Sequence, residues 1–225
     1  MSAGSTEDRG TARTEAFSDG VLAIAMTLLV LDLRDPTAGG TVSLAEGLLI
    51  RWPAFFALAT SGVTILIIWM NHHNMFNYIR RVDRRFMLFN GFLLFFVVLT
   101  PFTTALVANH LLSGDAGVAA TVYAGTFFLL SVVWNGLWWY SSTGHRLLGA
   151  NVTAAQVKSI TRQYYVAPVA YGLALLISPV SALVSVAVIL AVAGFYAITA
   201  SIGKEVDVSS AWSSPLRHLR RGRGK

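Results

Sequence analysis

The chain has 225 residues, of which 55% are hydrophobic and only 12% are charged, and its formal net charge is +6. Soluble domains usually carry about 25% charged residues, so this composition excludes an ordinary soluble protein and indicates an integral membrane protein. The chain contains no cysteine, which excludes a disulfide framework and thiolate metal sites.

Six stretches are candidates for membrane-spanning helices, each of which needs roughly 20 apolar residues. In chain order they are 14–33, 52–77, 86–111, 118–141, 163–182 and 184–203. The fifth and sixth are nearly continuous, and Pro179 is the reason to separate them. The sequence therefore predicts an all-α membrane domain over residues 13–206, with a disordered tail over 1–12 and a basic tail over 207–225.

The basic residues predict the orientation of these helices. If the N-terminus is cytoplasmic, 15 of the 17 lysines and arginines fall in cytoplasmic segments, and only Arg34 and Arg51 lie outside. Lysine and arginine accumulate in cytoplasmic loops, so we expect both termini to be cytoplasmic. The basic stretch 217–225 is then a topology and anionic-lipid signal, and nucleic acid is not an expected partner.

The first span, RTEAFSDGVLAIAMTLLVLDL over residues 13–33, carries carboxylates inside an apolar run. Only 12 uncharged residues separate Asp19 from Asp32, a rise of about 18 Å against a hydrocarbon core of roughly 30 Å. Carboxylates within a membrane usually face protein or water. This helix is therefore predicted to be surrounded by other helices rather than by lipid.

Helical phase separates Asp19 from an apolar stripe of the same helix. At about 100° per residue, one stripe is formed by Phe17, Gly20, Ile24, Thr27, Leu28 and Leu31. Asp19 lies nearly opposite, and Ser18 lies to the side. The residues alone leave two interpretations of the stripe open, which are ordinary helix packing and the lining of an axial pore.

The end of the second span offers partners for Asp19. His72 and His73 lie a few residues from the cytoplasmic boundary, at a depth similar to that of Asp19. A buried carboxylate needs a hydrogen-bonding or charged partner, so these imidazoles are its predicted partners. Adjacent histidines lie 100° apart on a helix and cannot share a metal as an i, i+4 pair does, so no metal site is expected.

The motif RxxxFSDGVxAI at the start of the first span resembles the signature of the transmembrane protein 175 family. The matching residues are Arg13, Phe17, Ser18, Asp19, Gly20, Val21, Ala23, Ile24 and Thr27. In the second span the similar residues are Trp69, Asn71, His72, His73 and Phe76. With six spans of this order, the resemblance covers most of residues 13–203.

This resemblance implies a potassium-permeable channel without a TVGYG filter, located in the plasma membrane in prokaryotes. It implies a homotetramer whose first helices line the pore. This chain carries one Phe-Ser-Asp motif, so four subunits would be needed to close one pore. Ile24, Leu28 and Leu31 would form the hydrophobic constriction, with Thr27 as the polar position beside it. The motif residues would hold the helices together rather than touch ions; they are Arg13, Phe17, Ser18, Asp19, Trp69, Asn71, His72 and His73.

Three other functions stay open at this point. A proton- or cation-coupled transporter would use Asp19, His72 and His73 as a relay, since intramembrane ionisable groups mark such paths. A membrane enzyme is not expected, because the sequence lacks H-E-x-x-H, G-x-S-x-G and paired-carboxylate motifs. A non-conducting scaffold is the third. No cofactor is expected beyond transient potassium ions in the pore.

Overall fold

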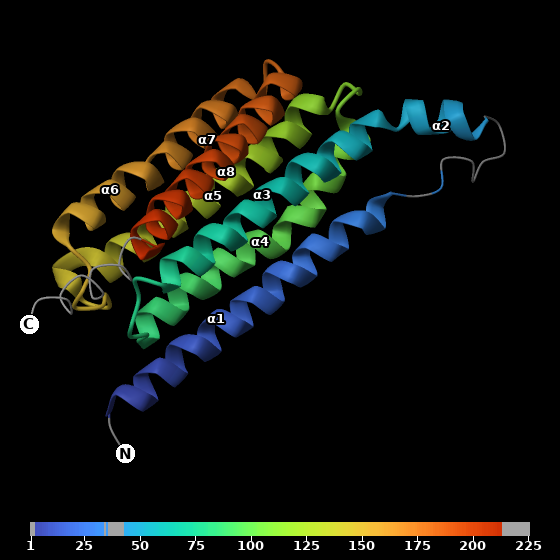
Figure 1. Cartoon of the computed structure of the whole chain (residues 1–225). Coiled ribbons are helices and arrows are strands. Elements are labelled where there is room, and N and C mark those ends of the chain that lie inside the picture. Colours follow the sequence, from blue (N-terminus) through green and yellow to red (C-terminus); the bar gives the residue numbers. More distant parts are fainter. Residues whose placement is uncertain (1–2, 34, 36–42, 213–225) are drawn as a thin grey trace, which may run out of the picture.

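The computed structural model describes residues 3–33, 35 and 43–212, with side chains described over 10–31, 33, 35 and 43–198. In chain order its elements are α1 Ala3–Leu28, the 3-10 helix η1 Leu29–Asp32, α2 Leu44–Ile50, α3 Trp52–Phe76, α4 Arg84–His110, α5 Ala116–Ser142, the 3-10 helix η2 Thr143–His145, α6 Ala154–Tyr164, α7 Val166–Ile177 and α8 Ala182–Trp212. The long helices lie side by side as one bundle (Figure 1).

Four helices in the described part of the chain are long and apolar enough to cross a membrane. They are Gly10–Leu31, Trp52–Phe76, Arg84–His110 and Ala116–His145, and Ala182–Ile198 is a shorter apolar helix. The first four predicted spans thus coincide with long apolar helices, and the chain is a multi-pass helical membrane protein.

The fifth predicted span, expected to be one helix over 163–182, is broken. α6 ends at Tyr164 and α7 begins at Val166. The cause is Pro168, which has no N–H to donate to the carbonyl of Tyr164 four residues earlier. Asn135 on α5 donates to that carbonyl instead, with Nδ2 3.1 Å from the oxygen. A side chain of a neighbouring helix therefore satisfies the backbone group that proline leaves free.

The turn between α7 and α8 lies where Pro179 predicts a boundary. α7 ends at Ile177 and α8 begins at Ala182. The turn is packed against the start of α5, because Ser178 Oγ lies 2.8 Å from Thr121 Oγ1. A Cβ added at Gly117 would lie 3.2 Å from the Pro179 carbonyl oxygen. Glycine at 117 thus permits a close approach of two backbones.

The N-terminal segment differs from the expected tail. α1 begins at Ala3, so residues 3–12 are helical. Thr11 is buried, and its Oγ1 donates to the carbonyl of Arg80 over 3.3 Å. Most of the predicted basic tail, from residue 213 onward, lies outside the described residues.

The turn between α3 and α4 is tied to the end of α5. Asp83 caps α4, with its Oδ1 accepting from the Phe86 N–H at 2.8 Å. The Tyr140 hydroxyl donates to Asp83 Oδ2 at 2.5 Å. Arg146 lies over the Tyr140 ring, 4.6 Å from its centroid. Ile79 and Leu148 form a short antiparallel bridge beside this cluster, which closes one end of the bundle.

Candidate pore-lining helix

α1 lies at one edge of the bundle and packs against α3 and α4 (Figure 1). Within one chain α1 is therefore covered on one side only, so this chain's own helices do not surround it. Ser18, Leu22, Ala25 and Leu29 form the stripe that it buries, with at most 2% of each residue exposed. Their spacing of three and four residues is that of one helical face, and this face attaches α1 to the rest of the chain.

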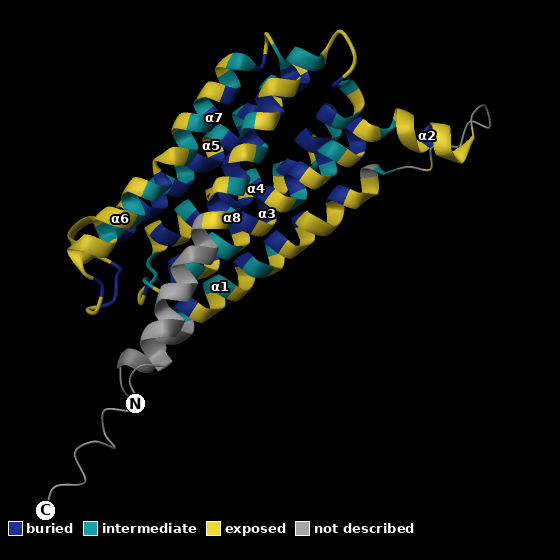
Figure 2. Ribbon diagram, turned by 45° about the horizontal axis from the view of Figure 1, so that its top comes forward, coloured by how far each residue is buried: buried dark blue, intermediate teal, exposed yellow. Residues whose placement is uncertain are grey.

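The opposite face of α1 is left open by its own chain, and exposed residues, drawn in yellow, recur along this helix (Figure 2). Ile24 is 61% exposed, Leu28 39% and Leu31 69%. Phe17 is 67% exposed, and Gly20 and Thr27 are also exposed. All six residues of the stripe predicted from helical phase are thus free to contact something outside this chain.

The helix tightens where the predicted constriction ends. Residues Leu29–Asp32 form a 3-10 helix, with a φ of −68° and a ψ of −23° at the preceding Leu28. In 3-10 geometry residues i and i+3 eclipse one another, because each residue advances by about 120°. Leu31 therefore lies almost directly above Leu28, a closer alignment than the 100° phase predicts.

Thr27 directs its hydroxyl hydrogen to its own helix. Its Oγ1 donates to the Ile24 carbonyl over 2.8 Å. The oxygen keeps lone pairs that can accept a hydrogen bond or contact a cation. Thr27 thus presents an acceptor at the level of the exposed aliphatic side chains.

A buried polar chain joins α1 to α3 and α4. Asn90 on α4 donates from Nδ2 to Ser18 Oγ at 2.8 Å, and its Oδ1 lies 3.0 Å from His72 Nε2. Ser18 donates in turn to the Thr14 carbonyl at 2.8 Å. Ser18 and His72 are fully buried and Asn90 is 3% exposed. Because an amide oxygen accepts, His72 must donate from Nε2, which leaves its Nδ1 as a buried acceptor without a partner.

The predicted pairing of Asp19 with His72 and His73 is wrong in its hydrogen bonds. His73 Nδ1 lies 2.8 Å from Glu15 Oε1, and His72 bonds Asn90. Asp19 Oδ1 is buried with no hydrogen-bond partner in the described part of the chain. Glu15 lies on the same side of α1 as Asp19, one helical turn nearer the N-terminus. At that level its carboxylate, and not that of Asp19, lies within hydrogen-bonding distance of His73.

Asp19 instead borders a half-open cavity of about 200 Å³ between α1 and α3. The other lining residues are Leu22, Ala23, Met26, Ile65, Leu66 and Trp69. Asp19 thus points away from the exposed stripe, as phase predicts, but into a space that its own chain leaves partly unfilled.

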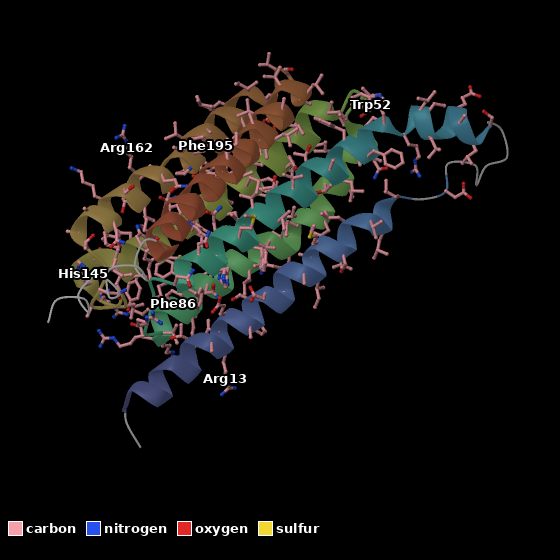
Figure 3. The ribbon with its side chains drawn as sticks, viewed as in Figure 1. Arg13, Trp52, Phe86, His145, Arg162 and Phe195 are labelled. Carbon is pink, nitrogen blue, oxygen red and sulfur yellow. The ribbon has the colours of Figure 1, made fainter. Side chains whose placement is uncertain are left out.

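The remaining motif residues do not join this polar chain. Arg13 is exposed and points away from the bundle (Figure 3). Asn71 donates to the Ile67 carbonyl of its own helix, and Trp69 stacks on His73 with ring centroids 6.2 Å apart. Glu15 and Asn90 were missed by sequence reasoning. The signal for Asn90 was available, because it is the one amide in the first half of the third predicted span, 86–111.

Among the side chains that the structure describes, no three histidine, aspartate or glutamate residues lie close enough together to bind a metal ion. The adjacent His72 and His73 form hydrogen bonds with different helices, His72 with Asn90 on α4 and His73 with Glu15 on α1. What the geometry provides is an open apolar face, one hydroxyl and a polar anchor on the opposite face.

Comparison with known proteins identifies relatives of this chain. The sequence profile described as endosomal/lysosomal potassium channel TMEM175 matches residues 13–101, which include the first-helix motif. A potassium channel of Chamaesiphon minutus is 43% identical over 194 residues, covering 85% of this chain and 96% of that protein. The chain belongs to the TMEM175 family.

Two further similarities extend over most of the chain. A potassium channel of Streptomyces collinus is 38% identical over 172 residues, covering 76% of this chain and 83% of that protein. The crystal structure of a lysosomal potassium-selective channel TMEM175 homologue from Chamaesiphon minutus superposes with a TM-score of 0.78 at 41% identity, covering 85% of this chain and 98% of that chain. This TMEM175 member therefore shares the fold of a solved family structure.

Proposed function

We propose that this TMEM175 family member is a potassium-permeable channel that conducts passively through a pore lined by α1. The observation that carries the proposal is the exposed face of α1, where Ile24, Leu28 and Leu31 are left uncovered by their own chain. Its relatives named above are described as potassium channels. The same relationship supports a non-enzymatic role.

The proposed assembly is a homotetramer of six-span subunits in the plasma membrane, with both termini cytoplasmic. In a single chain the side chains of Ile24, Leu28 and Leu31 stay exposed on one face of α1. Around a fourfold axis, the aliphatic face of each α1 turns inward and its buried face stays on α3 and α4. The fifth span then consists of α6 and α7, and the sixth is α8.

In this assembly the constriction is hydrophobic. Rings of Ile24, Leu28 and Leu31 narrow the axis, and a closed state expels water from it. Selectivity comes from pore width and the cost of dehydration, with Thr27 oxygens replacing part of the hydration shell. Because these oxygens are few, the expected preference for potassium over sodium is modest.

The test is ion flux into liposomes that contain the purified protein. Potassium entry above that of protein-free liposomes is the expected result, with smaller sodium entry. No cation flux at any voltage or pH would overturn the proposal. Cross-linking of the reconstituted protein checks the tetramer, which predicts four linked subunits.

A coupled transporter is the alternative function. It requires a relay of proton carriers, and Asp19 and His72 each have an unpartnered buried atom. Asp19 and His72 have no hydrogen bond to each other, and His72 bonds the neutral amide of Asn90. A proton relay between them is therefore less well supported than the channel. A pH gradient that drives potassium uphill would favour the transporter.

A further inference from the structure

Arginines from two separate loops gather at one end of the bundle. They are Arg80, Arg81, Arg84 and Arg85 in the α3–α4 turn and the start of α4, and Arg146 directly after η2, and all five are exposed. We call this set the arginine surface. The labels of Phe86 and His145 mark this end in Figure 3, and the label of Trp52 marks the opposite end.

Two side chains of the arginine surface are held in place by contacts within the protein. Arg81 donates from Nη2 to the Arg146 carbonyl over 3.2 Å. The Arg146 guanidinium lies over the Tyr140 ring, 4.6 Å from its centroid. A guanidinium has five N–H donors in one plane, so both groups keep donors at their edges that can bind a further acceptor. Such a planar fork matches two oxygens of one phosphate group.

The backbones of the two loops are also joined. The Arg80 N–H donates to the Leu147 carbonyl over 2.9 Å, and the Gly149 N–H donates to the Tyr78 carbonyl over 2.9 Å. A Cβ at Gly149 would lie 3.0 Å from Arg80 Cγ, so the absence of a side chain there lets the Arg80 stem pack on this loop. A ligand therefore meets guanidinium groups that are already positioned, and less conformational entropy is lost when it binds.

The positive charge of the arginine surface is not neutralised by the side chains that the structure describes. None of its five members forms a salt bridge with another described side chain. Asp83 lies in the same turn, but its carboxylate accepts from the Tyr140 hydroxyl and from the Phe86 N–H. The Arg146 charge acts on Asp83 as well. One carboxylate against five guanidinium groups leaves a site that attracts an anion.

The arginine surface lies at the boundary of the membrane-spanning part of the chain. α4 is long and apolar enough to cross a membrane, and Met87, Leu88 and Phe92, which follow the arginines along it, are exposed. Trp139 is exposed near the end of α5, and tryptophan is enriched where membrane and water meet. The guanidinium groups are therefore at the level of the lipid headgroups, beside an apolar face that acyl chains can cover.

We propose that the arginine surface binds the phosphate headgroup of an anionic phospholipid. Arg81 and Arg146 bind the phosphate oxygens through their free N–H edges, and Arg80, Arg84 and Arg85 add electrostatic attraction. The acyl chains lie along the exposed apolar residues at the start of α4. A lipid fits this position better than a soluble anion, because the charged site continues directly into an apolar surface.

Native mass spectrometry of the purified full chain in neutral detergent tests the proposal. Dioleoyl phosphatidylglycerol should bind more tightly than dioleoyl phosphatidylcholine. The double variant Arg81→Gln/Arg146→Gln should bind phosphatidylglycerol roughly 10- to 30-fold more weakly than the wild type, because each arginine near an anionic surface contributes about a factor of five. Lys158→Gln/Arg162→Gln is the matched control. It removes the same charge from exposed positions of α6 and should keep the wild-type affinity.

Two further variants separate binding from folding and charge from geometry. Arg81→Gln alone leaves the contact between Arg146 and Tyr140 in place and should weaken phosphatidylglycerol binding about fivefold. Arg81→Lys/Arg146→Lys keeps both charges but loses the planar forks, so its affinity should lie between those of the wild type and the double glutamine variant. The thermal unfolding midpoint without added lipid shows whether each variant is folded.

The thermal midpoint also reports lipid binding, because a ligand that binds only the folded state stabilises it. Phosphatidylglycerol should raise the midpoint of the wild type and of Lys158→Gln/Arg162→Gln, and should raise that of Arg81→Gln less. Equal affinities of the wild type for the two lipids would overturn the proposal. Equal losses in the Arg81 variants and in the α6 control would overturn it too, since binding would then follow total charge.

Inorganic phosphate separates a lipid site from a site for a free anion. If phosphate displaces phosphatidylglycerol at equal concentration, the arginine surface is a site for soluble anions and the lipid proposal is wrong. None of these measurements requires conduction. Absence of ion flux would therefore overturn the proposed channel and leave the lipid site unaffected.

Discussion

Asn90 on α4 donates a hydrogen bond to Ser18 on α1 over 2.8 Å, across 72 positions of the sequence. The same amide faces His72 on α3 at 3.0 Å. One side chain thus fixes the rotation of α1 relative to two other helices. The exposed aliphatic face of α1 is turned away from α3 and α4 partly because Ser18 is held in this bond.

Replacing Asn90 should destabilise the protein. Asn90→Ala leaves the buried His72 Nε2 donor without a partner and removes the hydrogen bond that Ser18 Oγ accepts, which costs about 1–3 kcal/mol. The measurement is the thermal unfolding midpoint of the purified protein in detergent, and a fall of several degrees is expected. Asn109→Ala is the matched control, because Asn109 is exposed on the same helix and its amide bonds the Ala105 carbonyl of that helix. Equal midpoints for the two variants would contradict the structural role of Asn90.

Shortening the exposed aliphatic side chains should widen the proposed pore. Ile24→Ala and Leu28→Ala each remove part of the hydrophobic ring, so sodium flux should rise relative to potassium flux in liposomes. Stability should change little, because both side chains are already exposed. Met26→Ala serves as control, since Met26 is also exposed on α1 but lies about 160° around the helix from each of these two residues. If Met26→Ala changes selectivity as much as they do, the stripe is not the constriction.

Asp83 makes stability depend on acid pH. Desolvation raises the pKa of this carboxyl, but hydrogen bonds from Tyr140 and from the Phe86 and Arg85 N–H groups, with the Arg146 charge, outweigh it and lower the pKa below the ordinary value of 3.8. A lowered pKa in the folded state contributes stability above the unfolded pKa, and this contribution is lost as pH falls through the folded pKa. The thermal unfolding midpoint should therefore decrease when the pH is lowered below about 4.

Two variants at this position separate charge from capping. Asp83→Asn keeps a side-chain acceptor for the start of α4 and should flatten the dependence on acid pH with a small loss at pH 7. Asp83→Ala also removes the cap, which costs a further amount of about 0.5–2 kcal/mol. Identical midpoints for the two variants at pH 7 would show that the cap contributes nothing.

Two glycines should respond to alanine in opposite directions. A Cβ at Gly117 would lie 3.2 Å from the Pro179 carbonyl oxygen and 3.4 Å from its Cα, so Gly117→Ala should push the α7–α8 turn away from α5 and lower the unfolding midpoint. A Cβ at Gly194 has no neighbour within 4 Å, and alanine favours a helix interior by roughly 0.5–1 kcal/mol. Gly194→Ala should therefore raise the midpoint, and a rise for both variants would contradict the close packing at Gly117.

Much of the fold follows from local chemistry. The first four spans were predictable because long apolar runs have few alternatives to helix in a membrane. The division near Pro179 was predictable from the missing N–H of proline. The break at Tyr165 was not, because whether Pro168 kinks or interrupts a helix depends on which neighbour satisfies the freed carbonyl, and that neighbour is Asn135.

The sequence by itself determined the depth of each polar group and the two faces of α1, because rise and rotation per residue are constants of the helix. It therefore placed Ile24 and Leu31 on one side and Asp19 on the other. Only the tertiary structure decided that His73 meets Glu15 and that His72 meets Asn90. Several side chains at equal depth on neighbouring helices could bond the same partner. Packing sets the rotation of each helix, and this rotation decides which pair comes within hydrogen-bonding distance.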